Sequence, residues 1–322
     1  MKILITGTTG LIGGSVLSRI SQRHPEYEIT ALVRPETDPS RLAEISGKAT
    51  IEKIDLGNIS KLIEYLDTHS FDYVYHIGAL RGGRKFSRQE FYETNVLSTE
   101  MLIENCIKNK STLIFCSSVG VFGAIPTELP ANNLTQKIGD NYYHYTKIEA
   151  EKRINKAMLL GLKAAILRPS ITYGEGDFGF PYQLVKMIKG HRLPLITKRI
   201  WIHLCHIDTI TSAFTWLVEN DFPNGLVLNV ADREPVLFKD LVNFISRQLT
   251  NKNYPSILQF DRRLFRAWEY VFWFLKDELW TSRVQLISRS WFYDVKPLFE
   301  TMDIPVHYTI PEFKFIIESI KK

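Results

Sequence analysis

The chain has 322 residues, of which 45% are hydrophobic and 23% are charged. This length and composition exclude a disordered chain, and the length alone suggests about two domains or lobes. The net charge is +5, the basic residues are scattered, and no nucleic-acid-binding motif is present, so we expect no nucleic-acid partner.

The first element is an apolar run from Ile3 that ends in three glycines spaced three residues apart, Gly7, Gly10 and Gly13. A helical pattern starts near Leu11, so the stretch predicts a strand, a phosphate-binding loop and a helix. Gly7 would allow a tight bend, Gly10 a close approach to a pyrophosphate, and Gly13 close packing of helix on strand. The alternative is a strand-to-helix turn that binds nothing, but the context favours a dinucleotide.

The periodicity then alternates between helix and strand. Predicted helices cover residues 11–23, 39–45, 59–69, 87–108, 142–160, about 182–189, 208–219 and 238–249. Predicted strands cover residues 28–33, 50–54, 72–77, 112–117 and 163–167.

This alternation predicts an α/β fold, a doubly wound parallel Rossmann sheet with a smaller, discontinuous C-terminal substrate lobe. Residues 1–175 would form the cofactor-binding domain that carries the catalytic residues, and residues 176–322 mainly the substrate lobe. Residues from about 200 to 225 would return to the Rossmann domain.

Cofactor choice is indicated at the end of the second strand, where NAD enzymes usually place an acidic side chain for the ribose 2′-hydroxyl. Val33 takes that position here, and Arg34 follows it. Arg34, helped by Arg41, could bind a 2′-phosphate through charge-assisted hydrogen bonds. We therefore expect NADP in preference to NAD, and a solvated surface arginine is the alternative.

A tyrosine and a lysine open the predicted helix 142–160 with i,i+4 spacing, which places Tyr143 and Lys147 on one face. A nearby ammonium and a cofactor ribose would favour the phenolate, so Tyr143 could exchange a proton with a carbonyl or alcohol oxygen. The strand 112–117 brings Ser118 to the edge where open α/β sheets bind ligands, and Ser118 could steady the substrate oxygen.

Together these motifs resemble the extended short-chain dehydrogenase/reductase family, strongly over residues 1 to about 175 and more faintly beyond. The motifs are Gly7/Gly10/Gly13, Asp55-Leu56, His76-Ile-Gly-Ala79, Asn95-Val-x-x-Thr99, Ser117-Ser118, Tyr143-x-x-x-Lys147 and Arg168-Pro169-x-x-x-Tyr173-Gly174. Fainter matches are His206-Ile-Asp208 and Leu228-Asn229-Val230, which look like turns of the substrate lobe.

The resemblance implies roles for individual residues. Asp55 would contact adenine, Gly78 and Ala79 would line the cofactor ribose, and Pro169 and Ile171 would lie beside the nicotinamide. The cofactor-binding set is Gly7, Thr9, Gly10, Leu11, Ile12, Gly13, Arg34, Asp55, Leu56, Gly78, Ala79, Tyr143, Lys147, Pro169 and Ile171.

Four residues would carry the reaction: Tyr143 as acid/base, Lys147 as its pKa modulator and ribose ligand, Ser118 as orienter and Asn95 as support. Asn95 would buttress the site by holding a helix distortion and a water. Arg168 has an alternative role in an internal ion pair, and Asp208 in capping the helix that follows it.

Departures from the family's subgroups narrow the reaction. Val119-Gly120 stand where 4,6-dehydratases carry an Asp-Glu pair, which argues against dehydration, and the segment from Arg168 to Gly174 lacks an epimerase-type asparagine. The hypothesis is an NADP(H)-dependent oxidoreductase that interconverts a carbonyl and a secondary alcohol, close to the reductase and 3β-hydroxysteroid dehydrogenase-like branches. The alternatives are a nucleotide-sugar epimerase or reductase, and a non-catalytic dinucleotide sensor.

The substrate would be a small molecule, either an apolar ketone or alcohol or a nucleotide sugar. An aromatic-rich segment, residues 260–281, fits a helical stripe. We interpret it first as a core helix, then as a substrate lid, and last as a peripheral membrane contact suggested by its three arginines. The resemblance also suggests a homodimer through the helices that carry Asn95 and Tyr143.

The three cysteines, Cys106, Cys116 and Cys205, are widely spaced in apolar surroundings. This suits reduced core side chains, so we expect neither a disulfide framework nor a metal site. The N-terminal strand lacks the apolar region of a signal peptide, and we find no run of about eighteen apolar residues, so we expect a cytoplasmic protein.

Overall fold

The computed structural model describes residues 1–81 and 86–321. Its centre is a seven-stranded parallel sheet in the order β11-β6-β5-β4-β1-β2-β3. The strands are β1 (Lys2–Thr6), β2 (Glu28–Val33), β3 (Thr50–Lys53), β4 (Tyr73–His76), β5 (Thr112–Cys116), β6 (Lys163–Pro169) and β11 (Leu226–Val230). The strand order reverses between β1 and β4, where sheets of this kind bind ligands beyond the carboxyl ends of their strands.

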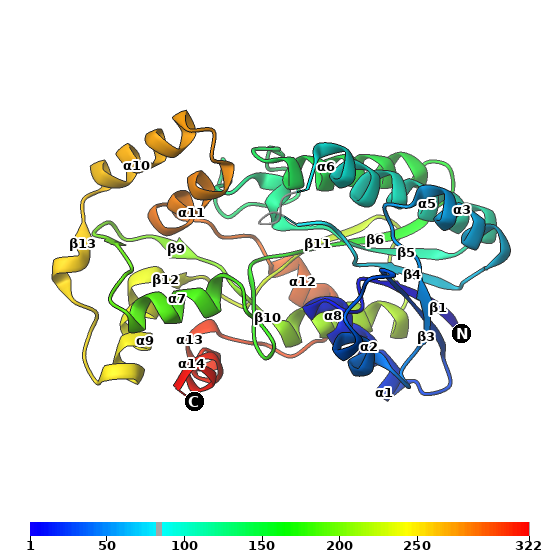
Figure 1. The fold of residues 1–322 in the computed structure, drawn as a ribbon, viewed down its shortest axis with the longest axis horizontal. Coiled ribbons are helices and arrows are strands. Elements are labelled where there is room, and N and C mark those ends of the chain that lie inside the picture. Colours follow the sequence, from blue (N-terminus) through cyan, green and yellow to red (C-terminus); the bar gives the residue numbers. More distant parts are fainter. Residues whose placement is uncertain (82–85, 322) are drawn as a thin grey trace.

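Helices cover both faces of the sheet, which confirms the predicted doubly wound α/β fold (Figure 1). One face carries α1 (Leu11–Arg23), α2 (Pro39–Ile45), α8 (Ile207–Glu219) and α12 (Lys296–Thr301). The other carries α3 (Ile59–Thr68), α5 (Ser98–Asn109) and α6 (Tyr142–Met158). Because both faces are buried, inner strands such as β1 and β5 are nearly continuous apolar runs.

The prediction for residues 228–230 was wrong. Leu228, Asn229 and Val230 belong to β11, which pairs with β6 at the edge of the central sheet and is covered by α12. These residues are therefore part of the Rossmann sheet, not turns of a separate lobe.

The remaining elements form a smaller lobe, on the left in Figure 1, with its own core around Trp291, Phe238 and Phe313. Its helices are α7 (Phe180–Lys189), α9 (Phe238–Thr250), α10 (Arg262–Phe274), α11 (Glu278–Ser288), α13 (Thr309–Glu312) and α14 (Lys314–Lys321). Short strand pairs join it: β7 (Thr172–Tyr173) with β10 (Cys205–His206), β8 (Leu195–Ile196) with β13 (Gln259–Phe260), and β9 (Trp201–Ile202) with β12 (Val236–Leu237), besides the 3₁₀ turn Ser256–Leu258.

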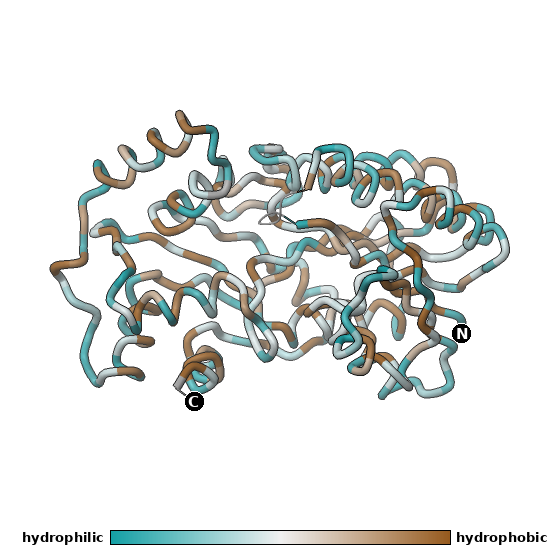
Figure 2. The backbone as a smooth tube through the Cα atoms, viewed as in Figure 1, coloured by the Kyte–Doolittle hydropathy of each residue, from teal (hydrophilic) through white to brown (hydrophobic). Residues whose placement is uncertain are grey.

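The interpretation of residues 260–281 as a core helix holds for one face of the segment only, because Phe265 lies in the core of the smaller lobe and Trp268 and Phe272 pack against it. The segment forms α10 and the start of α11, and Phe265 is the buried side chain of α10. Tyr270, Trp273 and Phe274 are exposed to 65%, 65% and 72%, and Figure 2 shows this apolar end of α10 at the edge of the molecule. Among the described residues, we find no helix with the length and apolar character needed to span a bilayer.

The prediction for the cysteines is confirmed. Cys106, Cys116 and Cys205 are buried with free thiols. Burial raises the pKa of Cys106 to about 12 and that of Cys116 to about 11, so both are neutral core side chains.

Candidate active site

The glycine loop has the geometry that the sequence predicted. Gly7 has a φ of +76°, and a Cβ there would lie 2.6 Å from the backbone nitrogen of Gly78. A Cβ at Gly13 would lie 2.2 Å from the carbonyl oxygen of Gly7. Gly7 therefore makes the bend, and Gly13 lets α1 pack against it.

The residues present fit a dinucleotide at the start of α1. Gly10 is the N-cap residue and offers no capping side chain, so the first amide groups of the helix stay open to an anionic ligand. The Thr8 hydroxyl is buried and lacks a hydrogen-bond partner among the described residues. With Thr9, Leu11 and Ile12 partly exposed beside it, the loop forms a cradle suited to a pyrophosphate.

Arg34 lies directly after β2, the strand next to β1. Its side chain is 42% exposed, and its Nε lies 3.9 Å from Glu36, so no tight ion pair holds it away from a ligand. Val33 is 3% exposed and packs in the core, while Arg41 is exposed on α2. An apolar side chain therefore stands where NAD enzymes usually carry an acid, and a cation follows it.

The residues expected around the adenine and ribose converge from two neighbouring loops. Asp55 accepts a hydrogen bond from the Gly57 amide at 2.9 Å, which shapes the turn after β3. The Leu56 side chain packs against Gly78, where a Cβ would lie 2.8 Å from it, and the partly exposed Ala79 follows. This close approach requires the glycine at position 78.

A buried chain of hydrogen bonds runs from β1 to Asn95. The Thr6 hydroxyl oxygen accepts from both amides of Ile77–Gly78, at 3.1 and 2.9 Å, so its proton points to Nδ1 of His76 at 2.9 Å. His76 Nε2 then donates to Thr99 at 3.0 Å, and Thr99 donates to the carbonyl of Asn95 at 2.8 Å. Burial lowers the pKa of His76 to about 3, which keeps the ring neutral as this chain requires.

Asn95 lies in a π-helical segment, η1 (Glu93–Leu97), between α4 (Arg88–Tyr92) and α5. Its side-chain oxygen accepts from the Leu80 amide at 2.7 Å, and its nitrogen donates to the Leu80 carbonyl at 2.9 Å and to Thr146 at 3.0 Å. The helix distortion that the resemblance implied is present. Asn95 ties the loop after β4 to α6, the helix that carries Tyr143.

Lys147 is buried at the sheet edge, and its Nζ donates to the carbonyl of Cys116 at 2.7 Å. Burial lowers the pKa of Lys147 to about 8, which leaves it mostly charged at neutral pH. Burial raises the pKa of Tyr143 to about 12, opposed by Arg81 and by hydrogen bonding with Ser118; Lys147 is not among the groups that shift it. Tyr143 is thus a protonated phenol, suited to donating a proton.

Ser118 and Tyr143 are held together by the packing of the turn after β5 against the start of α6. Ser118 caps a 3₁₀ turn, Val119–Phe122, and its hydroxyl accepts from the Gly120 amide at 3.0 Å. A Cβ at Gly120 would lie 2.4 Å from the His144 ring, which fits only against a glycine. The two hydroxyl-bearing residues therefore sit on rigidly packed neighbouring segments.

Arg168 forms an internal ion pair, which was the alternative to a direct role in the site. Its guanidinium donates to both carboxylate oxygens of Glu151, at 2.8 and 2.7 Å, and both side chains are buried. Glu151 also accepts from Ser117 at 2.6 Å and from Lys137 at 2.7 Å. Glu151 is not among the site residues expected from the sequence, although its i,i+4 spacing from Lys147 was a usable signal.

The two residues expected beside the nicotinamide lie at the end of β6. Pro169 is the last residue of that strand, next to β5. Ile171 follows and accepts a hydrogen bond from the Cys205 amide at 3.0 Å through its carbonyl. Both positions are at the carboxyl edge of the sheet, on the same side as Ser118.

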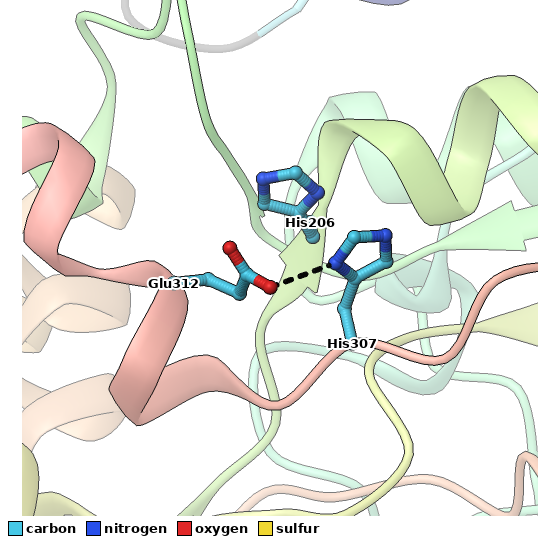
Figure 3. Close-up of side chains that lie close together, drawn as sticks. All are labelled: His206, His307 and Glu312. Carbon is cyan, nitrogen blue, oxygen red and sulfur yellow. Dashed lines mark hydrogen bonds and ion pairs between the residues drawn. The ribbon is translucent and has the colours of Figure 1, made fainter.

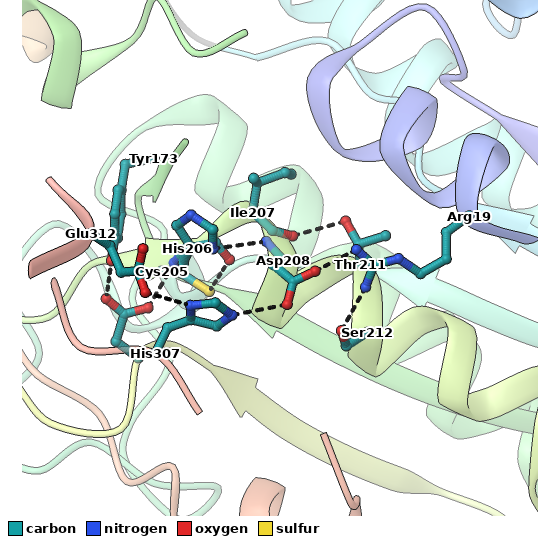
Figure 4. A network of polar contacts seen from close by, with 11 residues as sticks. Arg19, Tyr173, Cys205, His206, Ile207, Asp208, Thr211, Ser212, His307 and Glu312 are labelled. Carbon is teal, nitrogen blue, oxygen red and sulfur yellow. Dashed lines mark hydrogen bonds and ion pairs between the residues drawn. The ribbon is translucent and has the colours of Figure 1, made fainter. Parts of the chain in front are cut away.

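Asp208 does not cap α8, because His206 is the N-cap residue of that helix. The Asp208 carboxylate instead accepts hydrogen bonds from Arg19 and, at 2.9 Å, from Nε2 of His307 (Figure 4). These contacts join α1 and α8 to the segment before α13. The pKa of His307 is raised, mainly because its ring is hydrogen-bonded to Asp208.

His206, His307 and Glu312 offer potential metal-ligand atoms within 4.8 Å of one another, a grouping that the sequence analysis did not predict (Figure 3). The Nδ1 of His307 lies 3.2 Å from Glu312, and its ring stacks on His206 with centroids 4.3 Å apart. Both nitrogens of His307 face carboxylates, those of Asp208 and Glu312, so the ring of His307 is held by ion pairs.

A family model describes the same organisation. The model of the NAD dependent epimerase/dehydratase family matches residues 3–231, which include the glycine loop, Tyr143, Lys147 and β11. The chain belongs to this family. It is an extended short-chain dehydrogenase/reductase, and the family's relatives include sterol dehydrogenases and epimerases.

Individual proteins show the range of chemistry among its relatives. The chain is 25% identical over 320 residues to a sterol-4-alpha-carboxylate 3-dehydrogenase (decarboxylating) of Schizosaccharomyces pombe, covering 92% of this chain and 90% of that protein. It is 32% identical over 208 residues to a UDP-glucose 4-epimerase of Yersinia enterocolitica, covering 58% of this chain and 61% of that protein.

A solved structure shares the fold along the whole chain. The UDP-glucuronic acid 4-epimerase of Bacillus cereus, in complex with NAD, has a TM-score of 0.74 at 19% identity and covers 100% of both chains. This likeness shows the Rossmann fold, and the family match makes the chain an enzyme of the epimerase and dehydrogenase type. The individual roles of Ser118, Asn95, Tyr143 and Lys147 stay predictions.

Proposed function

We propose that this protein is an NADP(H)-dependent oxidoreductase that interconverts a carbonyl and a secondary alcohol. The observation that carries the proposal is the placement of the Tyr143 phenol beside Ser118, at the sheet edge that carries the glycine loop. A phenol with a pKa raised to about 12 is protonated at neutral pH and can act as a general acid.

Each side chain has a defined task in this reaction. A bound nicotinamide would supply the hydride to the carbonyl carbon in the reductive direction. The Tyr143 hydroxyl donates its proton to the carbonyl oxygen, Ser118 orients that oxygen, and solvent returns a proton to the phenolate. The Lys147 ammonium would bind the cofactor ribose, and its contact with the Cys116 carbonyl fixes its position.

An apolar ketone or alcohol is the proposed substrate class. The S. pombe relative that aligns over 92% of the chain is named as a sterol 3-dehydrogenase, which supports an alicyclic substrate. The segment from Arg168 to Gly174 also lacks the asparagine typical of sugar-nucleotide epimerases. In addition, the Arg168 guanidinium is occupied by Glu151 and is not available to a diphosphate.

The proposal is tested by incubating the purified protein with NADPH or NADH and a panel of cyclic ketones, followed by absorbance at the nicotinamide band. We expect cyclic ketones to be reduced, with NADPH preferred over NADH. Failure of every ketone and of every corresponding alcohol in the oxidative direction would contradict the proposal.

A nucleotide-sugar epimerase is the second candidate, favoured by the 32% identity to the Yersinia enterocolitica UDP-glucose 4-epimerase. Its signature would be a cofactor that co-purifies without exchange and protection against thermal unfolding by UDP- or dTDP-sugars. Binding of NADPH without turnover of any ketone, alcohol or sugar would instead indicate a dinucleotide sensor.

Replacement of Arg34 by alanine tests the cofactor. We expect NADPH affinity to fall by about 10- to 100-fold, since a charge-assisted hydrogen bond contributes about 1.5–3 kcal/mol. NADH affinity should change by less than about twofold, because NADH has no 2′-phosphate for the guanidinium to bind. Fluorescence titration of both nucleotides measures the two affinities.

Arg23 provides the matched control, because it is also exposed and near an acid but lies at the far end of α1. Arg23→Ala should leave both affinities unchanged. Equal losses of NADPH and NADH affinity in Arg34→Ala would contradict the 2′-phosphate contact.

The homodimer and the cytoplasmic location stay predictions. The apolar faces of α5 and α6 pack on the central sheet through Leu102, Ile103 and Ile154. The resemblance to the family is therefore the remaining support for dimerisation through these helices.

A further inference from the structure

An exposed apolar tip marks the end of α10. Tyr270, Val271, Trp273, Phe274 and Leu275 are exposed to 65%, 50%, 65%, 72% and 64%. The helix and its turn into α11 stand out from the rest of the lobe (Figure 1), and the tube is strongly apolar there (Figure 2). Contiguous exposure of aromatic and aliphatic side chains on this scale marks an interaction surface.

Basic side chains surround the base of the same helix. Arg262, Arg263 and Arg266 are exposed on its first two turns. A cavity of about 470 Å³ lies beneath them, and its lining includes Arg262, Arg266, Lys198, Arg289 and the acid Glu269. Arg289 neutralises Glu269 through a hydrogen bond of 2.7 Å, so the cavity keeps an excess of positive charge.

The other acids of the segment are engaged by the helix ends. Asp261 accepts from the Arg263 amide at 2.8 Å and caps α10. Asp277 accepts from the Trp280 amide at 3.0 Å and caps α11. Glu278 and Lys276, of opposite charge, are both exposed near the tip. The surface therefore combines an apolar tip with a cationic base.

We propose that the α10–α11 hairpin docks the protein on an anionic phospholipid bilayer. Arg266 and Phe274 are eight residues apart, about 12 Å along a helix, so the tip can reach the acyl boundary while the arginines stay among the headgroups. Tryptophan and tyrosine favour this interface because each ring has an apolar body and a polar group. The cationic cavity receives a lipid phosphate.

The exposed side chains of the tip favour contact with a bilayer over a role as a lid on a bound substrate. Trp268 and Phe272 pack against the core of the lobe, while Trp273 and Phe274 are exposed. A lid would turn its apolar side chains toward the carboxyl edge of the sheet. The aromatic side chains at the tip of α10 are exposed to solvent instead.

The test is co-sedimentation of the full chain with phosphatidylcholine–phosphatidylglycerol vesicles and with pure phosphatidylcholine vesicles. We expect binding to the anionic vesicles that weakens as salt increases, with tryptophan emission shifted to shorter wavelength. The double variant Trp273→Gln/Phe274→Gln should lower the partition coefficient by at least about tenfold. Arg262→Gln/Arg266→Gln should lower binding to anionic vesicles and remove most of its salt dependence.

Leu159 and Leu160 provide the control, because they are exposed to 86% and 69% just after α6. Leu159→Gln/Leu160→Gln should bind vesicles as the unchanged protein does. Absence of vesicle binding by the unchanged protein, or equal binding by the tip variant, would overturn the inference. A tip variant that changes the sedimentation velocity in lipid-free buffer would assign the surface to a second copy of the chain.

The inference does not depend on the proposed reaction. Turnover of a water-soluble ketone should be unchanged in the tip variant, since its substitutions lie on the exposed end of α10. Loss of catalysis with retained vesicle binding in a Tyr143 variant would separate the two proposals.

Discussion

Tyr143→Phe should reduce ketone turnover by about 10²- to 10⁴-fold, the usual contribution of a positioned general acid. The substitution removes the hydroxyl but keeps the ring on α6. Dinucleotide affinity should change by less than about threefold, because the cradle at Gly7, Gly10 and Gly13 and the contacts of Lys147 remain. Steady-state kinetics and nucleotide titration on the same preparation measure both quantities.

The matched control is Tyr145→Phe, on the same helix turn. Tyr145 is 39% exposed and is not among the residues proposed to act on the substrate. Removal of the Tyr145 hydroxyl should leave turnover within about twofold of that of the unchanged protein. Retention of most activity by Tyr143→Phe would remove Tyr143 from the mechanism. A fall in both variants would indicate a structural effect on the start of α6.

Arg168→Met should lower the free energy of unfolding by about 3 kcal/mol, because it leaves the Glu151 carboxylate buried without its bidentate partner. Glu151 is fully buried in the structure, and Lys137 alone remains to neutralise it. Urea unfolding followed by circular dichroism measures the loss. Lys152→Met, which removes an exposed ion pair with Glu149 on the same helix, should change stability by less than about 1 kcal/mol.

The pH dependence of this effect has a definite sign. Burial would raise the pKa of Glu151, but its contacts with Arg168 and Lys137 outweigh burial and lower it below 4.5. The ion pair therefore contributes stability above the pKa of an unfolded glutamate and loses it as the pH falls through the lower, folded value. The difference between Arg168→Met and the unchanged protein should shrink on acidification. A constant difference down to acid unfolding would contradict the ion pair's role.

Much of the fold followed from local patterns. Helical and strand periodicities identified the elements from β1 to α6 to within a few residues, because each amphipathic segment repeats its burial along a few turns. The same patterns missed β11, since Leu226–Val230 is short and becomes a strand only by pairing with β6, some sixty residues earlier. Pairing between distant segments leaves no local signal.

The candidate site was likewise predicted in part from local spacing, while its long-range contacts were not. The spacing of Gly7, Gly10 and Gly13, and of Tyr143 and Lys147, determined the cradle and the shared helix face, because both depend on backbone geometry within a few residues. The partners of these residues could not be read from spacing. Thr6, His76 and Thr99 form one chain to Asn95 only because β1, β4 and α5 are packed side by side.

The sequence by itself therefore determined the fold class, the dinucleotide loop and the Tyr143–Lys147 pair, since short-range spacing and periodicity encode them. The tertiary structure alone decided which charges are paired and which apolar faces are covered. Arg168 became an ion-pair partner of Glu151, and α10 kept its aromatic end exposed, because burial depends on which distant elements pack against a face.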